Sequence, residues 1–519
     1  MILKKIQTLI FLLIVIIVNA QDEFITIWKP ASTAIPTLTI DAPYQATPQQ
    51  IWFPGIGDNY DIYWEEVGYP QHNGSLTNVT STKQVLIDFG TSLSDGTDAK
   101  YRVKVTNGNG VFRQIKFGNP QLFAAPEQII PIWQVNGSAD KLLEIEQWGN
   151  ISWASMNNAF SLCRLMGLTA TDTPKLNNVE DASFMFYGTT TFTGASSMQN
   201  WDTSKIRNFS FMFSLLSDIN PSSSLIDQFN SPYLDSWNMS SATDLSYMFA
   251  NRAHFNKTLN SWDVSKVTDM SWMFGQCLSF NQRLDNWDTS NLEDMHFMFH
   301  MIPVFNQPLN WNTSKVTNMA HVFHGCTSFN QSLESWDMTK VTKIDQILNV
   351  ASSFNQPLGN WNLASVTNGG GALTMSGINC ENYSKTLMGW AENPNTANNV
   401  SLGPVTGLKY ASNVSDKRDI LINKGWSLVG DTVGSCLLSS SDLKLNKKLS
   451  LYPNPAVDDI HIEGLADIKN YKIYDVSGRL VKEGNPNRDM INVSSLPKGN
   501  YILQLTMKEK TISSKFIKK

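Results

Sequence analysis

The chain has 519 residues, of which 42% are hydrophobic and 16% are charged, and its net charge is −5. This length allows three or four domains with ample core. The negative charge and a pI near 5.8 exclude an electrostatic reason to bind nucleic acid or an anionic membrane, so we expect no nucleic-acid partner.

The N-terminus predicts a secretory signal peptide. Two lysines precede an apolar run over residues 9–18. This run is too short to span a bilayer, whereas a basic start and a small residue at the end are typical of a cleaved signal. We therefore expect a signal peptide over residues 1–20, with cleavage between Ala20 and Gln21. No other apolar run approaches the ~20 residues of a spanning helix, so we expect no transmembrane segment.

Residues 21–131 show the alternation of β-strands. Tyr60, Ile62 and Trp64 alternate with other side chains, and similar runs follow after short turns. The pattern predicts a β-sandwich of about seven strands. Two aromatic residues of this region, Trp52 and Tyr69, are candidates for an exposed binding face, although single surface aromatics are also normal.

A repeat of about 25 residues dominates residues 141–375. Its tryptophans recur at positions 201, 237, 262, 287, 311, 336 and 361. A unit of this length exposes an apolar face until a neighbour covers it, so the period predicts a solenoid of about eight to nine rungs with one continuous core. Residues 376–433 predict two helices that cap its open end, and residues 437–448 predict a linker rich in Ser and Lys.

The pattern within each repeat predicts a short strand followed by a short helix. Val267, Met270, Met273 and Phe274 have the spacing of one helix face. The other half, Phe255–Trp262, is too short for a helix and predicts a strand in parallel pairing with the next rung. The expected fold is therefore multidomain: an N-terminal β-sandwich, a leucine-rich-repeat-like α/β solenoid and a small C-terminal β-sandwich.

Two sets of polar residues recur with the repeat. One asparagine per rung is expected to hold backbone groups of its own and the next rung. The Asp or Asn after each Trp could form a calcium ladder, but its place two residues before Ser, Thr or Ala indicates a turn-closing side chain. The two sets are Asn256, Asn281, Asn306, Asn330 and Asn355, and Asp263, Asp288, Asn312, Asp337 and Asn362.

Four histidines lie close together in the sequence: His296, His300, His321 and His324. The register of two adjacent rungs could bring His300 and His324 to about 5 Å, near the spacing of zinc ligands. No Cys or carboxylate completes the set, so we expect exposed histidines at helix ends. We predict no metal and no cofactor.

The five cysteines divide into two groups. Cys163, Cys277 and Cys326 occupy one repeat position where other copies carry Thr, Ile or Ala, so we expect small core residues there. Cys380 and Cys436 are the one plausible disulfide pair, and the sequence leaves their state open.

The repeat elements Trp-Asp-x-Ser, Val-x-x-Met, Met-Phe and Phe-Asn resemble those of BspA-like leucine-rich-repeat surface proteins. The resemblance covers roughly residues 141–433. It implies a leucine-rich-repeat-like fold and a binding or adhesive role at the cell surface, and it brings no catalytic residues. The N-terminal region is loosely similar to polycystic-kidney-disease-like domains, but it has Trp64-Glu65-Glu66 where that family has a Trp-Gly-Asp-Gly turn.

Residues 449–519 are similar to the type A sorting domain of the type IX secretion system. The signature residues are Tyr452, Pro453, Asn454, Pro455, Gly478, Gly499 and Tyr501, and a basic end follows. The resemblance implies export across both membranes of a Gram-negative cell through the type IX machinery. The domain is then removed, and the rest is anchored at the outer surface or released.

No Ser-His-Asp order, Walker loop or zinc-protease motif occurs, so we expect no enzyme. The expected function is that of a secreted surface protein that binds an extracellular protein or glycan through its repeats. An alternative is a glycan-binding accessory protein with its ligand site on the N-terminal sandwich. A third reading is a purely structural matrix component.

Overall fold

The computed structural model describes residues 22–32, 46–125, 128–215, 227–438, 450–463, 468–486, 490–507 and 511–519. The expected cleavage site at Ala20 and Gln21 and most of the expected linker lie outside these residues. The chain forms two compact units, residues 1–436 and 437–519, which are described separately. Among the described residues, no helix has the length and apolar character needed to cross a membrane.

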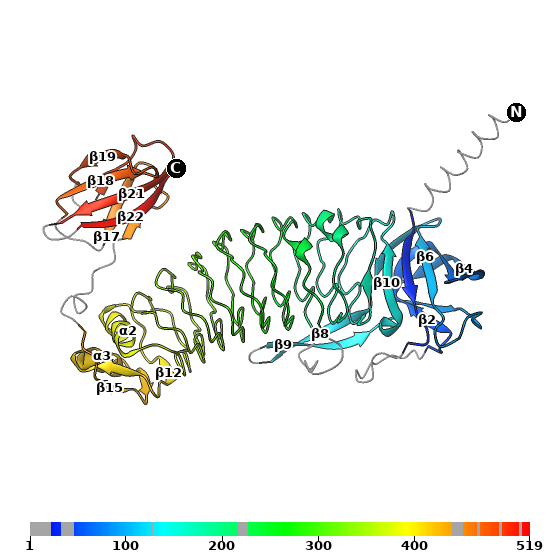
Figure 1. The fold of residues 1–519 in the computed structure, drawn as a ribbon, viewed down its shortest axis with the longest axis horizontal. Coiled ribbons are helices and arrows are strands. Elements are labelled where there is room, and N and C mark those ends of the chain that lie inside the picture. The colour runs from blue at the N-terminus through cyan, green and yellow to red at the C-terminus, as the bar shows by residue number, and fades with distance from the viewer. Residues whose placement is uncertain are drawn as a thin grey trace. The chain divides into compact units, whose positions relative to one another are not determined.

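The first unit begins with a mixed sheet (Figure 1). Its strand order is β11-β10-β1-β6-β3-β4, and β7 pairs with β3. Two further strand pairs, β2 with β5 and β8 with β9, flank this sheet. The strands are β1 (Phe24–Trp28), β2 (Gln50–Phe53), β3 (Gly55–Glu66), β4 (Tyr69–Ser81), β5 (Val85–Asp88), β6 (Tyr101–Thr106), β7 (Val111–Ile115), β8 (Gly118–Ala125), β9 (Gln128–Val135), β10 (Leu142–Gln147) and β11 (Gly167–Leu168).

This sheet is continuous with the repeats. Strand β10 pairs in antiparallel fashion with β1, and it pairs in parallel with β11, which already lies among the first repeats. The alternation predicted for Tyr60, Ile62 and Trp64 is present, because all three side chains are buried in β3. A cut after residue 131 would therefore remove two strands from the sheet.

The α/β solenoid predicted for residues 141–375 is wrong. Among the described residues of this region, the repeats contain no α-helix. Besides β10 and β11, the regular pieces there are short 3-10 helices, η1 (Ala139–Lys141) at its start, η2 (Ser196–Asn200) and η3 (Pro232–Leu234). After β11, the described repeats up to residue 375 contain no strand, and successive repeats share isolated parallel bridges such as Asp269 to Asp294.

Left-handed residues are the physical reason why no helix forms. Trp272 and Gln276 have φ values of 57° and 62°, far from the −63° of an α-helix. The Met273 N–H donates to Met270 O within one turn, whereas the Trp272 N–H donates to His296 O of the next repeat at 2.9 Å. Donors thus alternate between the turn and the neighbouring repeat, so an uninterrupted helical ladder cannot form.

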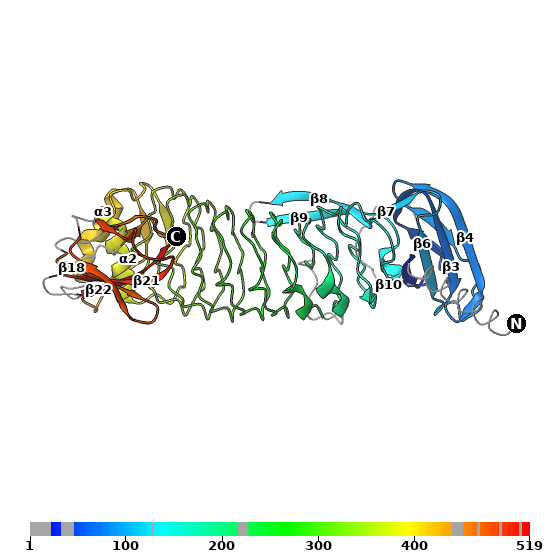
Figure 2. The same ribbon diagram turned by 90° about the horizontal axis from the view of Figure 1, so that it is seen from above.

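The repeats lie one upon the next in chain order (Figures 1 and 2). The Phe274 and Phe299 rings stack at 5.9 Å between centroids, and Trp287 stacks on Trp311 at 6.0 Å. From Trp237 to Trp361, the repeat tryptophans also donate their indole N–H to a carbonyl of the preceding repeat, as Trp287 does to Leu259 O at 2.9 Å. The spacing of the apolar residues thus predicted correctly which side chains are buried, but it predicted an α-helix wrongly.

Two α-helices follow the last repeat, as the sequence predicted for this segment. They are α2 (Cys380–Glu392) and α3 (Ser415–Asn423), and Gly425 with a φ of 82° follows the second. Short parallel pairs accompany them: β12 (Ser401–Pro404) with β14 (Ser427–Val429), and β13 (Lys409–Ala411) with β15 (Thr432–Gly434).

The second unit consists of two antiparallel sheets that share one core. The three-stranded sheet has the order β16-β17-β20 and the four-stranded sheet β19-β18-β21-β22. Ile460 and Ile473, from different sheets, are both fully buried in the common cluster. The strands are β16 (Ser450–Tyr452), β17 (Asp459–Glu463), β18 (Asn470–Asp475), β19 (Leu480–Gly484), β20 (Met490–Asn492), β21 (Gly499–Thr506) and β22 (Thr511–Lys518).

A fully buried arginine marks the irregular step between Phe213 and Phe249. Arg252 occupies the repeat position where the next copy has Cys277. Its guanidinium donates to Asp227 Oδ1 and to Thr189 O, both at 2.8 Å. Burial lowers the pKa of Arg252, and the nearby Asp227 carboxylate opposes this shift. The ion pair thus connects Asp227 to Arg252 of the stacked repeats.

We expect Asp227→Asn to lower the free energy of unfolding by about 3 kcal/mol, because it leaves the buried Arg252 charge without its partner. Urea unfolding measures this change. The double variant Arg252→Cys/Asp227→Asn should lose less than the sum of its single variants. Arg207→Ala, which removes an exposed pair with Glu180, should cost under about 1 kcal/mol. An Asp227→Asn variant as stable as the parent would contradict the assignment.

A column of aspartates lies on successive repeats. Asp244, Asp269 and Asp294 are joined by parallel bridges. Burial raises the pKa of Asp269, the Ser271 hydrogen bond lowers it, and the carboxylates above and below raise it further. A raised pKa means that the ionised form is disfavoured in the folded state.

Asp269→Asn should raise the melting temperature at pH 7, because it removes a disfavoured charge and keeps the oxygen that accepts from the Ser271 N–H. The gain should shrink as the pH falls through the raised pKa of folded Asp269, and it should disappear below the ordinary Asp pKa of about 3.9, where the parent carboxyl is protonated in both states. Asp263→Asn is the matched control with the opposite sign, since the Ser265 hydrogen bond lowers the pKa of Asp263. Thermal melts across this pH range test both signs.

Candidate functional site

Two of the sorting-signature residues lie in the wall of one groove of the second unit. Asn454 and Tyr501 line a groove of about 550 Å³ together with Phe516 and Ile517 of β22. The Tyr501 ring stacks on Phe516 at 5.5 Å, and its hydroxyl donates to Pro497 O at 2.8 Å. Two signature positions far apart in the sequence thus meet across the sheets.

Asn454 connects the first signature motif to the C-terminal strand. Its side-chain oxygen accepts from the Ile517 N–H at 2.8 Å. The backbone continues this contact, because the Ala456 N–H donates to Ile517 O at 2.7 Å. Tyr452 is half exposed and stacks on His461 at 5.3 Å, and the prolines Pro453 and Pro455 both follow cis peptide bonds.

Gly478 lies in a tight turn between β18 and β19. Its φ of 82° is in the left-handed region, which glycine adopts without a steric penalty. The Asp475 carboxylate closes this turn by accepting from the backbone N–H groups of Ser477 and Arg479. Gly499 starts β21, opposite Lys518 of β22. Both glycines therefore belong to the frame of the sorting unit and not to its groove.

The asparagine ladder has the structural role predicted for it. Asn256 Oδ1 accepts from the Asn281 N–H at 3.1 Å and from Gln282 Nε2 at 2.8 Å. The same pattern recurs at Asn281, Asn306, Asn330 and Asn355. The predicted side chain-to-backbone contact is confirmed, and it joins neighbouring repeats.

The acidic residues after the tryptophans close turns. Asp263, Asp288 and Asp337 each accept from the N–H two residues later, at 2.9 to 3.0 Å, and Asn312 does the same at 3.1 Å. Since amides serve this role as well as carboxylates, the turn explains the position without a calcium ion. The predicted helix that should follow is absent.

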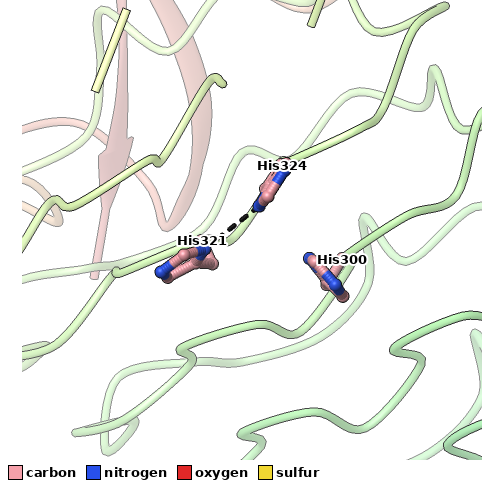
Figure 3. A group of neighbouring side chains, drawn as sticks. All are labelled: His300, His321 and His324. Atoms are coloured by element: carbon pink, nitrogen blue, oxygen red, sulfur yellow. Dashed lines mark hydrogen bonds between the residues drawn. The ribbon is translucent and has the colours of Figure 1, made fainter. Parts of the chain in front are cut away.

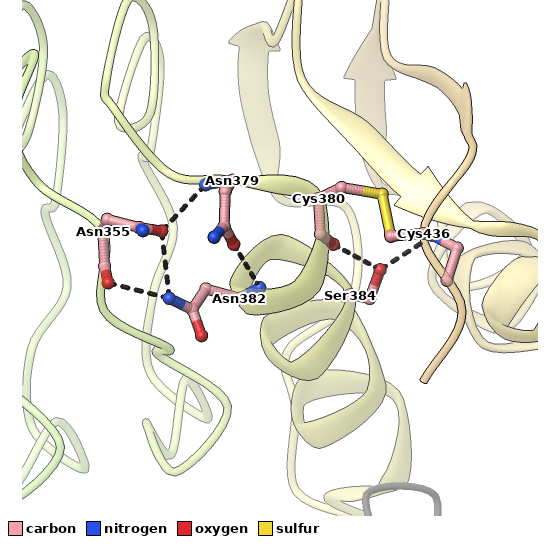
Figure 4. The surroundings of a disulfide bond; sticks show 7 residues. Asn355, Asn379, Cys380, Asn382, Ser384 and Cys436 are labelled. Carbon is pink, nitrogen blue, oxygen red and sulfur yellow. Dashed lines mark hydrogen bonds between the residues drawn. A yellow bond between two sulfur atoms is a disulfide. The ribbon is translucent and has the colours of Figure 1, made fainter. Parts of the chain in front are cut away.

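The cysteines divide as the sequence suggested. Cys163, Cys277 and Cys326 are fully buried and unpaired. Cys380 and Cys436 form a disulfide, which joins the start of α2 to the end of the first unit (Figure 4). The asparagine ladder ends beside it, because Asn355 Oδ1 accepts from the Asn379 N–H at 2.9 Å.

A Ser, His and Glu cluster in the N-terminal sheet was not anticipated. Glu66 is buried and accepts from Ser94, from the Leu93 N–H and from His72 Nδ1. Burial raises the pKa of Glu66, but these donors outweigh it and lower the pKa to about 2. Ser94 and His72 both point at the carboxylate and not at each other, so the cluster pins the loop after Phe89 and has no nucleophile–base pair.

The positions of the four histidines differ most from the prediction. They do not lie at exposed helix ends: His321 is buried, and His296, His300 and His324 are half-buried. His296 contacts Asp294 at 2.6 Å. The other three converge from two adjacent repeats, and sequence spacing brought only His300 and His324 into consideration.

Comparison with known families gives two matches. Residues 154–231, 222–310 and 282–390 are similar to the family described as Mycoplasma protein of unknown function, DUF285. Residues 450–519 match the secretion system C-terminal sorting domain. No curated protein matches the chain. The C-terminal unit thus supports sorting by the type IX secretion machinery and fits a secreted or cell-surface protein.

Asn454→Ala should weaken the anchoring of β22 by about 1 kcal/mol, because the Ile517 N–H loses its acceptor. Hydrogen exchange at the Ile517 amide in the full chain measures this loss. Asn500→Ala, at an exposed position beside the same groove, is the matched control and should leave the exchange unchanged. Equal protection of Ile517 in both variants would show that the side chain is not its anchor.

Proposed function

We propose that this chain is a non-enzymatic surface protein of a Gram-negative bacterium that binds an extracellular partner through its repeats. Its sorting domain supports export by the type IX system. The DUF285 match is compatible with a BspA-like repeat protein that acts in adhesion. The ligand-binding role rests on the outward-facing side chains of the repeats.

The observation that carries this proposal is an exposed apolar group on two successive repeats, here termed the repeat edge. Leu278, Met301 and Val304 have exposed fractions of 44%, 44% and 42%. Leu278 lies between Phe274 and Phe280, and Met301 and Val304 lie in the equivalent segment of the next repeat, between Phe299 and Phe305, so all three belong to the same border of the stack. Exposed apolar side chains that gather in this way favour a protein partner.

The side chains that point into the stack are engaged with one another and offer a ligand little to bind. The asparagine ladder and the turn-closing aspartates are engaged in contacts within or between repeats. The stacked Phe and Trp rings are buried, as Phe274 and Trp287 illustrate at 0% and 4% exposure. Binding therefore falls to residues that differ from one repeat to the next.

The glycan-binding alternative has its own observation. Tyr69 is 38% exposed at the start of β4, and Val67 on the other side of Gly68 has the same exposure. An exposed aromatic ring is a suitable stacking surface for a sugar. Trp52, the other predicted candidate, is half-buried in β2 and is less accessible.

A comparison of two surface variants of the full secreted chain separates these functions. Leu278→Ser/Val304→Ser should weaken binding to an immobilised extracellular-matrix protein by about tenfold or more, whereas Tyr69→Ser should leave it unchanged. All three positions are solvent-exposed, so the fold should tolerate the changes. Surface plasmon resonance on a matrix-protein panel and a glycan array provide the two readouts.

The remaining outcomes contradict the proposal in distinct ways. Glycan binding that only Tyr69→Ser abolishes would assign the ligand site to the N-terminal sheet. Self-association without binding to either panel would identify a structural matrix component. Hydrolysis of an arrayed glycan or a panel protein would show that the chain is an enzyme.

A further inference from the structure

Three imidazole rings from two adjacent repeats surround one small space (Figure 3). His300 belongs to one repeat, and His321 and His324 belong to the next. The Nδ1 atoms of His321 and His324 are 3.1 Å apart, and the His300 ring lies 4.8 Å from that of His324. One nitrogen from each residue can be chosen so that all three lie within 4.8 Å of one another.

We propose that His300, His321 and His324 bind a divalent transition-metal ion, for which zinc is the natural probe. Zn–N bonds of 2.0–2.1 Å place the nitrogens of a tetrahedral site about 3.3 Å apart. The Nδ1 atoms of His321 and His324 are already near this separation, whereas the site as a whole, with nitrogens within 4.8 Å of one another, has to contract around the ion. Three imidazoles also leave one position of the metal open to water or to a ligand.

Buried polar atoms without partners support the site. Among the described residues, His300 Nδ1 is buried and accepts or donates no hydrogen bond. Asn349 Oδ1 is in the same state, on the next repeat and at the register of His324. Unsatisfied buried polar atoms are rare and costly, so two of them beside one cluster indicate an unfilled polar site.

Aromatic packing accounts for the position of the rings but not for their nitrogens. His321 stacks on Phe297 at 4.0 Å, and His300 meets the edges of Trp272 and Phe297 at 5.1 and 5.0 Å. An apolar ring would serve these contacts equally well. Burial lowers the pKa of His300 to about 3 and that of His321 to about 4, so both rings are neutral and can donate lone pairs.

The ligand set determines the class of ion. Imidazole nitrogens suit Zn²⁺, Cu²⁺ and Ni²⁺, whereas Ca²⁺ and Mg²⁺ require oxygen ligands. The Asp294 carboxylate, on the same repeat as His300, is engaged by His296. We therefore expect binding of zinc and no binding of calcium.

The repeats themselves supply conservative test variants. The register of His300 is occupied by Gly275 in the preceding repeat, and that of His324 by Asn349 in the following one. His300→Gly and His324→Asn thus introduce residues that this fold already accepts at these positions. His254→Gln, at an exposed histidine of another repeat, is the matched control.

Isothermal titration of the metal-stripped full chain, without a polyhistidine tag, tests the site with ZnCl₂ and CaCl₂. The parent and His254→Gln should bind one zinc ion, and His300→Gly and His324→Asn should bind it about 100-fold more weakly. Cobalt absorption should report tetrahedral coordination in the parent and in His254→Gln, but not in His300→Gly or His324→Asn. Unchanged zinc affinity in both variants, or no saturable zinc binding by a parent with a normal melting curve, would overturn the assignment.

Discussion

The repeat region depends on backbone donors that only the next repeat can satisfy. Left-handed residues such as Trp272 and Gln276 turn alternate N–H groups out of their own coil, and these groups bond to His296 and His300 carbonyls one repeat away. A buried N–H without an acceptor is costly. The stacking order is therefore imposed by the backbone, and the aromatic columns at about 6 Å follow from it.

Because each repeat depends on a neighbour for its hydrogen bonds, the first repeat, the last repeat and any irregular step need other partners. At the start of the stack the sheet provides the neighbour, because β10 and β11 pair in parallel. At its end Asn355 Oδ1 accepts from the Asn379 N–H at the start of α2, and a disulfide fixes the same helix. Next to the longer step from Phe213 to Phe249, Arg252 takes the repeat position of an otherwise small side chain and pairs with Asp227. Hydrogen bonds, an ion pair or a disulfide thus take the place of the regular repeat contacts at each of these three points.

The sequence predicted which side chains are buried better than it predicted the backbone. Val267, Met270 and Phe274 are buried as expected, but overlapping turns place residues inward at nearly the same intervals as a helix. Their distinguishing sign, φ above zero at non-glycine residues such as Trp272, leaves no trace in a hydrophobicity pattern. Gly478 was easier to interpret because it acts in a short turn that its own motif contains. The contact of Asn454 with Ile517 spans 63 residues, and the motif alone does not indicate it.

The same distinction explains where new chemistry can arise in this fold. The column that contains Phe274 and Phe299 admits little change, since each ring packs against its neighbours. The position that follows the stacked Phe varies more. It holds Gly275 in one repeat, His300 in the next and His324 in the one after that. Histidines in this register on two neighbouring repeats lie close together, and His321 completes the group of three. Convergence of residues about 25 apart is thus a property of the stack, and a chain-order inspection of motifs cannot detect it.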